Sequence, residues 1–256
     1  MASESQAVAL ELSPPRVPAG TLVYAVGDIH GCADLLEKMH AEIIRDAGNA
    51  EAERRVVVYL GDYVDRGPDS SGVVDLLLDK PLEGFESYYL MGNHEDFLLE
   101  FLDDPEIGPG WIFNGGAATL ESYGVKADFG LGFGLEELVE LQEKFVKALP
   151  ERHLEFYRKL AFTHEEGDYF FVHAGVRPGV PLENQSDEDM LWIREEFLDS
   201  LNNHGKVIVH GHTITWEPEF RVNRIGVDTG AFTSGTLTSL VLESHEQDVL
   251  QVDADV

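Results

Sequence analysis

The segments TLVYAVGD (residues 21–28), RRVVVYLGD (54–62) and SYYLMGN (87–93) decide the fold. Each is a short run rich in apolar and β-branched residues that ends on a glycine followed by a polar residue. Helical patterns separate them at CADLLEKMHAEII (32–44) and SGVVDLLLD (71–79). Strands that alternate with helices are typical of βαβ units with a parallel sheet. The polar residues after the glycines should therefore meet at one edge, where open α/β sheets bind ligands.

Further strand patterns come later in the chain. They resume at DYFFVHAG (168–175) and KVIVHGHT (206–213), and LWIREEFLDSL (191–201) between them has helical spacing. The β-branched segments FRVNRIGVDTG (220–230) and GTLTSLVLE (235–243) are typical of antiparallel strands. We therefore predict an α/β fold in which mixed sheets form a two-layer β-sandwich flanked by helices on both outer faces.

The chain is predicted to form one compact domain. Its 256 residues are 43% hydrophobic, which is enough for an ordinary core at a length that one core still supports. We expect a single domain over residues 21–256, with a helical insertion at about 103–150 around the helical pattern at 135–149. Residues 1–20 lack the basic start and apolar centre of a signal peptide, and they are predicted to be a flexible tail.

The charge balance argues against several classes of partner. The chain carries 48 acidic and 18 basic side chains, a net charge of −30 at pH 7. Nucleic acids and anionic membrane surfaces are bound through clustered Lys and Arg, so neither is an expected partner. No apolar run approaches the ~18 residues needed to cross a bilayer. The single cysteine, Cys32, cannot close an intramolecular disulfide, which suits a reducing compartment, and we expect a cytoplasmic protein.

Five short motifs pair glycine with side chains that can bind metals. They are GDIHG (27–31), GDYVDRG (61–67), GNHE (92–95), HAG (173–175) and HGHT (210–213). Carboxylate, imidazole and amide oxygen are ligands that suit Mn, Fe and Zn. One such motif alone, however, more often marks a turn or a helix cap than a metal site. Their joint occurrence at successive strand ends indicates a metal centre. Asp28 and His30 point to one side of an extended segment, and Asp62 is placed to bridge two ions.

The motif set resembles the PPP-type metallophosphatases, the serine/threonine protein phosphatase family within the calcineurin-like phosphoesterases. The resemblance covers residues from about Thr21 to Glu243, nearly the whole chain. Within that family, GDIHGC (27–32), FNGG (113–116), LWIRE (191–195) and VDTGA (227–231) are most similar to the bacterial and phage lambda phosphatase branch. The resemblance implies a calcineurin-like metallophosphoesterase fold.

Two divalent metal ions are implied by the same resemblance, with manganese expected and iron or zinc as alternatives. The implied ligands of the first ion are Asp28, His30 and Asp62, and those of the second are Asp62, Asn93, His173 and His212. The wider superfamily often has a further histidine ligand two residues after His212, but this chain has Ile214 there. We expect a first metal position that is more open to water.

The catalytic groups are assigned from the resemblance and from the chemistry of phosphate transfer. Two cations can present hydroxide to phosphorus and neutralise charge on the phosphoryl group. The leaving oxygen then needs a proton, and His94 is expected to supply it, with Asp65 stabilising its imidazolium form. Arg66 and Arg194, together with the ligand Asn93, are expected to bind the phosphate oxygens.

The expected activity is hydrolysis of phosphate monoesters, with phosphoserine and phosphothreonine in proteins as the substrate. The nearest rival is a dinucleoside polyphosphate hydrolase, because symmetrical diadenosine tetraphosphatases resemble this motif set too. Those enzymes generally differ at the positions of Asp65, Glu95 and Thr213, so these residues favour a protein phosphatase. Met91 replaces the arginine common before the glycine of GNHE and predicts altered packing there. A third interpretation is a metal-binding scaffold that has lost catalysis. It would require the loss of a metal ligand or of the proton donor, and the sequence retains all of them.

Overall fold

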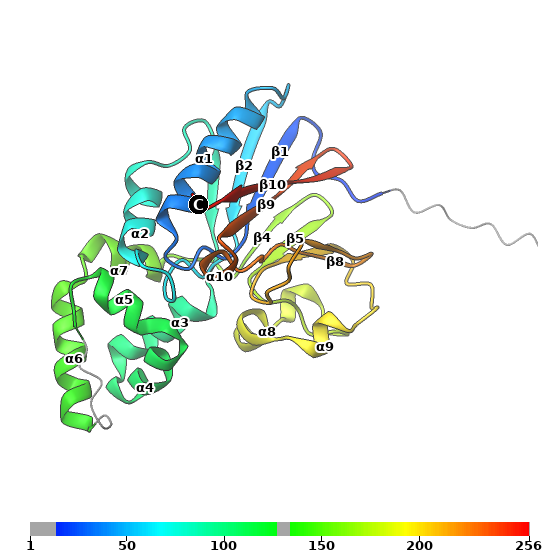
Figure 1. Cartoon of the computed structure of the whole chain (residues 1–256). Helices are drawn as coiled ribbons and strands as arrows, with labels where there is room; N and C mark the ends of the chain where they lie inside the picture. The colour runs from blue at the N-terminus through cyan, green and yellow to red at the C-terminus, as the bar shows by residue number, and fades with distance from the viewer. Residues whose placement is uncertain (1–13, 127–133, 256) are drawn as a thin grey trace, which may run out of the picture.

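Two five-stranded sheets form the centre of the molecule. The structure is a computed structural model, and it describes residues 14–126 and 134–255. The first sheet has the strand order β10-β9-β1-β2-β3, and the second has the order β4-β5-β6-β8-β7. Each sheet contains parallel and antiparallel pairs, and the two sheets lie face to face in Figure 1. The predicted two-layer sandwich of mixed sheets is confirmed.

The strands are short in the second sheet and longer in the first. The first sheet comprises β1 (Thr21–Val26), β2 (Arg54–Tyr59), β3 (Glu86–Tyr89), β9 (Thr236–Glu243) and β10 (Glu246–Asp253). The second comprises β4 (Thr163–Glu166), β5 (Tyr169–Val172), β6 (Val207–His210), β7 (Glu219–Phe220) and β8 (Arg224–Gly226). Strands β1, β2 and β3 run parallel, as do β5, β6 and β8, so each sheet gathers several carboxyl ends at one edge.

Helices cover the outer faces of both sheets. They are α1 (Ala33–Ala47), α2 (Ser70–Asp79), α3 (Asn93–Asp103), α4 (Gly108–Trp111), α5 (Ala117–Ser122), α6 (Leu135–Ala148), α7 (Glu151–Arg158), α8 (Asp187–Trp192), α9 (Glu195–Leu198) and α10 (Ala231–Ser234). Shorter helical turns lie at Pro105–Ile107, Ile112–Gly116 and Leu182–Asn184. Figure 1 shows α1 and α2 beside the first sheet and α8 and α9 beside the second.

Strand β1 explains how the layers are held together. Its side chains alternate, and all six residues are buried. Leu22, Tyr24 and Val26 pack toward the helices, in a cluster that also contains Leu36 of α1. Val23 and Ala25 of the same strand pack toward the second sheet. A strand buried on both faces reads as a continuous apolar run, which is the pattern TLVYAV shows.

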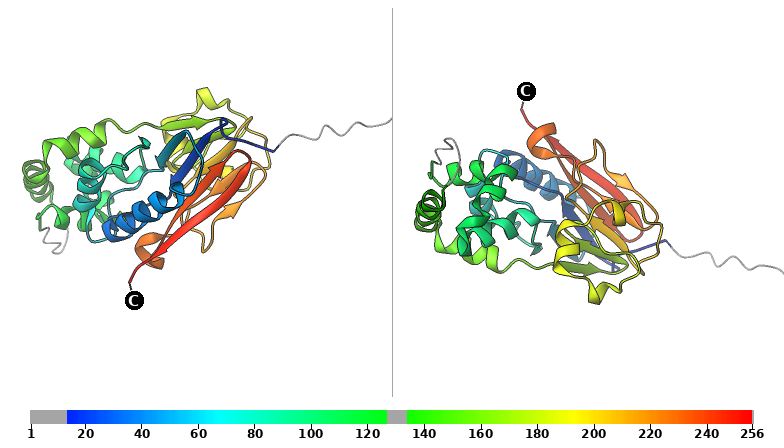
Figure 2. Two further views of the ribbon diagram at one scale, coloured as in Figure 1. Left: turned by 90° about the horizontal axis from the view of Figure 1, so that it is seen from above. Right: turned by 90° about the horizontal axis from the view of Figure 1, so that it is seen from below.

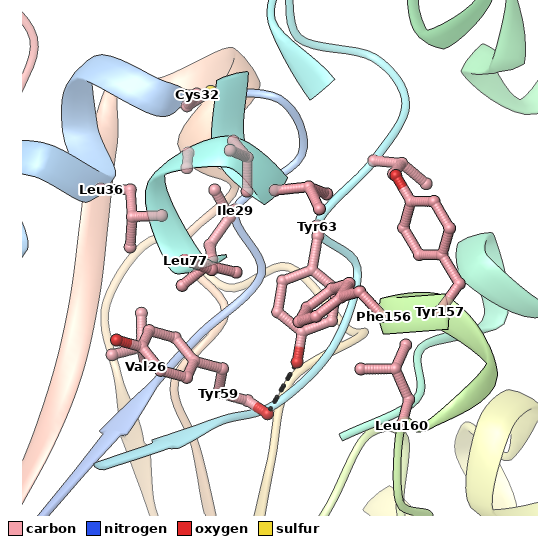
Figure 3. Packing of buried hydrophobic residues seen from close by; sticks show 14 of the residues in the cluster. Val26, Ile29, Cys32, Leu36, Tyr59, Tyr63, Leu77, Phe156, Tyr157 and Leu160 are labelled. Carbon is pink, nitrogen blue, oxygen red and sulfur yellow. Dashed lines mark hydrogen bonds between the residues drawn. The ribbon is translucent and has the colours of Figure 1, made fainter. Parts of the chain in front are cut away.

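The apolar cluster under α1 and α2 continues as far as α7, as Figure 3 shows. Val26, Tyr59 and Leu77 pack in this cluster, and the ring of Tyr63 meets the ring of Phe156 of α7 edge to face with centroids 5.4 Å apart. Burying each such side chain contributes about 1.5–3 kcal/mol to folding. This packing fixes the loop after β2, from which three of the predicted site residues project.

Helices α4, α5, α6 and α7 form a group at one end of the sheets, as both views of Figure 2 show. The expected helix at 135–149 is present as α6. It packs through Leu138, Leu141 and Phe145, which recur at helical spacing. Phe145 contacts Trp111 of α4 with ring centroids 5.5 Å apart, so the group has its own aromatic packing. Helices α4, α5 and α6 lie within residues 103–150, where we expected an insertion, and α7 follows directly after that range.

Three local expectations differ from the structure. The expected helix at 191–201 is divided into α8 and α9, because Ile193 and Arg194 leave helical geometry between them. The segment 220–230 was expected to form an antiparallel strand, but its β8 runs parallel to β6 and antiparallel only to the short β7. Strand β10 was not expected, because most of its side chains are exposed or half-buried and the sequence lacks a clear apolar run there.

The expected flexible tail lies partly outside the described residues, which begin at residue 14. In the described part, Val17 is buried between the sheets, and its backbone N–H donates to the carbonyl of Ser244 at 2.9 Å. Residues 14–20 therefore pack against the sandwich. Within the two described ranges, no helix has the length and apolar composition that a membrane span requires.

Candidate metal centre

The predicted site residues follow the carboxyl ends of strands from both sheets. Asp28 and His30 come after β1, Asp62 after β2, and Asn93 begins α3 after β3. The second sheet brings His173 after β5. It also brings His212 after β6. Because the parallel strands of each sheet end at the same edge, side chains more than 180 residues apart are brought together, and the backbone N–H of His212 donates to Asp28 at 3.0 Å.

A cavity of about 290 Å³ lies at this edge. Seven of the ten predicted site residues line it, namely His30, Asp62, Arg66, Asn93, His94, Arg194 and His212. The other three, Asp28, Asp65 and His173, are buried behind it. The structure thus brings the whole predicted set together, and it adds Thr213, Ile214 and Asp228 to the lining.

One group of donor atoms surrounds the space between Asp62, Asn93, His173 and His212. Asn93 Oδ1 lies 2.9 Å from His173 Nε2 and 2.8 Å from His212 Nδ1. The two histidine nitrogens are 3.2 Å apart, and His173 Nε2 is 3.5 Å from Asp62 Oδ1. Asp62, His173 and His212 form one of the two groups of metal-capable side chains that share Asp62 among the described residues, and Asn93 adds its amide oxygen to it.

A second group lies on the other side of Asp62. His30 Nε2 is 3.4 Å from Asp62 Oδ2, and His94 Nε2 is 3.9 Å from the same oxygen. The Oδ1 atom of Asp62 faces the first group and Oδ2 faces this one, so a single carboxylate stands between the two. This is the bridging position expected of Asp62. Asp28 lies next to His212 and Asp228 but outside both compact groups.

The hydrogen bonds of two histidines show that these groups fit a cation. His173 Nδ1 donates to the carbonyl of Leu60 at 2.9 Å, and His30 Nδ1 donates to the carbonyl of Val64 at 2.8 Å. The proton is therefore on Nδ1 in both rings, and each Nε2 presents a lone pair toward Asp62. Lone pairs and carboxylate oxygens that face one another repel unless a cation lies between them. Imidazole nitrogens and carboxylate oxygens are ligands that bind divalent transition metals such as manganese, iron and zinc.

Burial keeps the histidines neutral and able to bind a metal. It lowers the pKa of His30 to about 3, although the nearby Asp62 charge opposes the shift. It also lowers the pKa of His173 and of His212. Burial would raise the pKa of Asp62, but the surrounding histidines outweigh that effect and hold it well below its usual range. His30, His173 and His212 are therefore neutral imidazoles around the ionised Asp62 carboxylate at neutral pH.

The backbone of the site is strained. Six non-glycine residues have positive φ among those described, and five of them are His30, Asp62, Asp65, Arg66 and His212. The left-handed region costs an ordinary L-residue about 1–2 kcal/mol, so it persists only where surrounding structure imposes it. Strain of this kind concentrates at functional sites.

Glu95 holds the loop that carries Asp62. Its buried carboxylate accepts backbone N–H bonds from Asp62 at 2.9 Å, Tyr63 at 2.8 Å, Val64 at 3.2 Å and Gly92 at 3.0 Å. An aspartate would be one methylene too short to span the same four donors from this helix. Gly92 also requires glycine, because a Cβ there would lie 2.1 Å from Asp62 Oδ1.

His94 and Asp65 form a buried pair beside the cavity. His94 Nδ1 donates to Asp65 Oδ2 at 2.7 Å, and Arg66 Nη2 donates to His94 Nε2 at 3.1 Å. Burial opposes protonation of His94, but the charges of Asp62 and Asp65 outweigh it and raise its pKa. Nε2 is the atom that faces the cavity side of the pair, where Arg66 also lies.

Two residues that the sequence reasoning missed complete the surroundings of Asp65. Trp111 Nε1 donates to Asp65 Oδ2 at 3.0 Å, and the Thr119 hydroxyl donates to Asp65 Oδ1 at 2.6 Å. Trp111 belongs to α4 and Thr119 to α5. The FNGG segment lies between Trp111 and Thr119 in the sequence, and it was noted only for its resemblance to one branch of the family. It could have indicated that this region reaches the site, because the Gly115 carbonyl accepts the Arg66 N–H at 3.2 Å. The helical group therefore orients a catalytic candidate.

Arg194 reaches the cavity because the helix breaks there. Its Nη1 donates to the His212 carbonyl at 3.3 Å and to the Thr213 hydroxyl at 3.2 Å. Within the described ranges Arg194 forms no ion pair with a carboxylate. An ion pair with a neighbouring glutamate on a helix surface is therefore not its role in this structure. Arg66 lies with its guanidinium 4.8 Å over the ring of Phe232. Both arginines therefore present charge to the cavity.

Two departures from the expected motifs have clear positions. Ile214 lines the cavity in place of a histidine and is partly exposed. Met91 is buried in the core, where its backbone N–H donates to the Ala161 carbonyl at 2.7 Å. His210 is buried against Phe197 with ring centroids 5.1 Å apart, and its Nδ1 bonds the adjacent Gly211 carbonyl.

Comparison with known families agrees with this geometry. The pattern of the calcineurin-like phosphoesterases matches residues 21–232. The chain belongs to this family. A calcineurin-like phosphoesterase is a hydrolase of phosphate esters, and the His/Asp groups around Asp62 have the side chains that such a metal centre needs. The predicted superfamily is thereby confirmed, whereas the PPP-type branch is not decided by the match.

Several curated relatives of this phosphoesterase share one name. The bis(5'-nucleosyl)-tetraphosphatase PrpE [asymmetrical] of Bacillus thuringiensis (strain Al Hakam) is 23% identical over 235 residues, covering 84% of this chain and 88% of that protein. The protein of the same name from Oceanobacillus iheyensis is 24% identical over 233 residues, covering 84% and 86%.

Solved structures with a similar fold carry several names. A putative diadenosine tetraphosphatase has a TM-score of 0.58 at 21% identity and covers 93% of this chain and 98% of its own. A protein serine/threonine phosphatase from Saccharomyces cerevisiae has a TM-score of 0.55 at 13% identity, covering 95% and 85%. A cold-active protein-tyrosine phosphatase of a Shewanella species has a TM-score of 0.52 at 19% identity, covering 92% and 83%. At these identities the likeness supports the fold alone.

Proposed function

We propose that this phosphoesterase hydrolyses phosphate monoesters, with phosphoserine and phosphothreonine in proteins as its substrates, as a PPP-type enzyme of the bacterial and phage lambda branch. The observation that carries the proposal is the convergence of Arg66, Arg194 and His94 on the cavity that also holds Asp62. A dianionic phosphoryl group is bound well by two arginines, and a poor leaving group needs a proton donor such as His94.

The two proposed metal positions share Asp62, and the first takes Asp28 from beside the compact group in place of His94. Asp28, His30 and Asp62 would hold one divalent ion, and Asp62, Asn93, His173 and His212 would hold the other. Manganese is the proposed metal, with iron or zinc as alternatives, because carboxylate, amide and imidazole donors suit all three. When bound, such a pair lowers the pKa of a shared water and offsets charge on the phosphoryl group.

The side chains of the chain itself supply binding and the proton. Arg66 and Arg194 would bind non-bridging phosphate oxygens, with Asn93 at the floor of the cavity. His94 would donate a proton from Nε2 to the leaving oxygen. Asp65 holds the opposite nitrogen, Nδ1, at 2.7 Å and thereby stabilises the protonated ring. Arg66 now donates to that Nε2, so it must turn toward the substrate before His94 can carry a second proton.

The preference for a protein substrate rests on the size of the cavity and on three residues. A volume of about 290 Å³ accommodates a phosphorylated side chain and is small for enclosing a dinucleotide. Asp65, Glu95 and Thr213 are the residues that separate protein phosphatases from the diadenosine enzymes in the motif comparison. Here Asp65 pairs with His94, Glu95 fixes the Asp62 loop, and Thr213 accepts from Arg194. A cytoplasmic location belongs to the same proposal.

A second candidate is hydrolysis of a dinucleoside polyphosphate. The observation that favours it is the name shared by the Bacillus thuringiensis and Oceanobacillus iheyensis relatives, which match 84% of this chain. The metal groups and the arginines would serve such a substrate too, because the attacked atom is again phosphorus. The nucleosides would then lie outside the cavity, against the surface around Ile214.

A phosphate-release panel distinguishes the two candidates. The purified protein with Mn²⁺ is assayed on phosphoserine, phosphothreonine and phosphotyrosine peptides, an aryl phosphate and diadenosine tetraphosphate, by free phosphate and by nucleotide chromatography. We expect the highest kcat/KM on the phosphoserine or phosphothreonine peptide. His94→Asn should slow that reaction by about 10²–10⁴-fold with both metals retained. A higher kcat/KM on diadenosine tetraphosphate would favour the second candidate, and no hydrolysis of any substrate would favour a non-catalytic scaffold.

A further inference from the structure

A buried carboxylate outside the expected ligand set lies in the cavity. Asp228 is only 2% exposed, yet it lines the same cavity as His30, Asp62 and Ile214. It follows β8, so it emerges from the second sheet at the edge where the other site residues gather. The motif VDTGA was noted in the sequence only as a branch resemblance, and neither the proposed ligands nor the proposed catalytic groups use it.

The backbone places Asp228 directly beside Asp28. A Cβ at Gly27 would lie 2.7 Å from the carbonyl oxygen of Val227, so these two residues of different sheets are in van der Waals contact. Asp28 directly follows Gly27, and Asp228 directly follows Val227, so the two aspartates are also neighbours. Their carboxyl groups lie close enough to interact with each other. Glycine at position 27 is what allows this approach.

The charge of Arg66 acts on both carboxyl groups, but no ion pair joins Arg66 to either of them among the described residues. Asp228 Oδ1 accepts the backbone N–H of Gly230 at 2.8 Å, and Asp28 accepts the N–H of His212 at 3.0 Å. The ion pairs of the site join histidines to Asp62 and Asp65, and neither Asp28 nor Asp228 has one in the described parts of the chain. The two carboxyl groups are also within hydrogen-bonding reach of each other, which requires that they share a proton. Two buried carboxyl groups side by side cannot both be ionised unless a cation lies between them, and without one they share a proton.

We propose that Asp228 is a further ligand of the first metal position, together with Asp28, His30 and Asp62. The inference rests on the proposed dimetal function. It supplies a protein ligand on the side where the superfamily often has a histidine and this chain has Ile214. The two residues are neighbours in space, since Ile214 Cγ2 would be 3.0 Å from a Cβ at Gly230, and the Asp228 carbonyl accepts the Thr215 N–H at 3.0 Å.

The added carboxylate has a consequence for metal choice. With Asp228 the first position would hold three carboxylates and one imidazole, a harder and more anionic set than the histidine-rich second position. Such oxygen-rich sites suit Mn²⁺ better than Zn²⁺. The two positions should therefore differ in preference, with Mn²⁺ entering the first and a softer ion tolerated in the second.

Metal titration tests the proposal independently of activity. Calorimetry and elemental analysis of Mn²⁺ binding should give two ions per chain for the wild type. In Asp228→Asn, the ion of the first position should bind at least about tenfold more weakly, with the second unchanged. Asp28→Asn should weaken the same ion, and the exposed Asp103→Asn should change neither. Wild-type affinity for both ions in Asp228→Asn would overturn the proposal, whereas a wild type that binds no ions would overturn the proposed dimetal function itself.

Thermal unfolding separates a ligand from a merely structural residue. Asparagine keeps the oxygen that accepts from Gly230 and removes one of two adjacent acidic groups. Metal-free Asp228→Asn should therefore melt at a higher temperature than the metal-free wild type. With saturating Mn²⁺ the order should reverse, because the wild type gains more binding free energy. A lower melting temperature of the variant in both states would show a structural role only and would overturn the proposal.

Discussion

Replacing Asp65 by asparagine tests the acid assignment through a residue that touches no metal ligand side chain. The Asp65 carboxylate accepts from His94 Nδ1 at 2.7 Å, from the Thr119 hydroxyl at 2.6 Å and from Trp111 Nε1 at 3.0 Å. Asparagine offers one acceptor oxygen and an NH₂ group. If the oxygen stays with Thr119 and Trp111, the NH₂ group faces His94 Nδ1, and the protonated ring loses its counter-charge.

The expected magnitude follows from that geometry. A hydrogen bond to a charged group contributes about 1.5–3 kcal/mol, and losing the opposite charge beside a buried ion raises the total to roughly 3–5 kcal/mol. Because 1.36 kcal/mol corresponds to a tenfold change in rate, kcat should fall by about 10²–10⁴-fold. The proton donor is lost while the metal ligands stay in place, so metal content should not change.

The assay is a series of aryl phosphates whose leaving phenols differ in pKa. A good leaving group needs little protonation, so the loss in Asp65→Asn should be smallest for the most acidic phenol and grow as the phenol becomes less acidic. Asp103→Asn, a substitution of an exposed aspartate in α3, is the matched control. A loss of equal size across the series, with both ions bound and the variant folded, would refute the role of the His94–Asp65 pair as the acid.

Three further predictions concern the bridge, the substrate and a buried histidine. Asp62→Asn should release both ions and cost more activity than Asp28→Asn, as elemental analysis and initial rates would show; two bound ions with unchanged turnover would contradict the bridge. Mono-aryl phosphates should have a higher kcat/KM than bis-aryl phosphates, because a monoester offers three free oxygens to the metals, Arg66 and Arg194; a diester preference would overturn the monoester proposal. Burial lowers the pKa of His40 to about 4, below its unfolded value of about 6.5, so the unfolded state takes up the proton first as the pH falls. The unfolding free energy from urea titration should therefore drop between pH 6.5 and 4 by up to about 3 kcal/mol more in the wild type than in His40→Gln, and parallel pH profiles would contradict this.

The gathering of the site residues was predictable because it depends on local features. Strand patterns that end in Gly-Asp or Gly-Asn place their polar residue at the carboxyl end of a strand, and parallel strands bring those ends to one edge. Asp28, Asp62 and Asn93 meet for this reason in the first sheet. His173 and His212 follow the same rule in the second sheet, and the packing of the two sheets brings the sets together.

Other parts of the site depend on packing that the sequence does not display. Trp111 and Thr119 lie 46 and 54 residues from Asp65, on short helices whose position is decided by aromatic contacts with α3 and α6. The break before α9 was hidden because the apolar spacing of 191–201 fits a continuous helix. The direction of β8 was missed because β-branched composition indicates a strand and not its partner.

The left-handed residues at the site have a consequence for how this chain tolerates change. Five such positions, at about 1–2 kcal/mol each, cost on the order of 5–10 kcal/mol, which is comparable with the whole stability of a typical domain. Glycine or asparagine would relieve that cost at Asp65 or Arg66 while removing the side chain that function needs. A population of variants selected for heat tolerance alone, with no substrate present, should therefore drift toward glycine and asparagine at these positions. Positions enriched in this way would map the active site without any assay of catalysis.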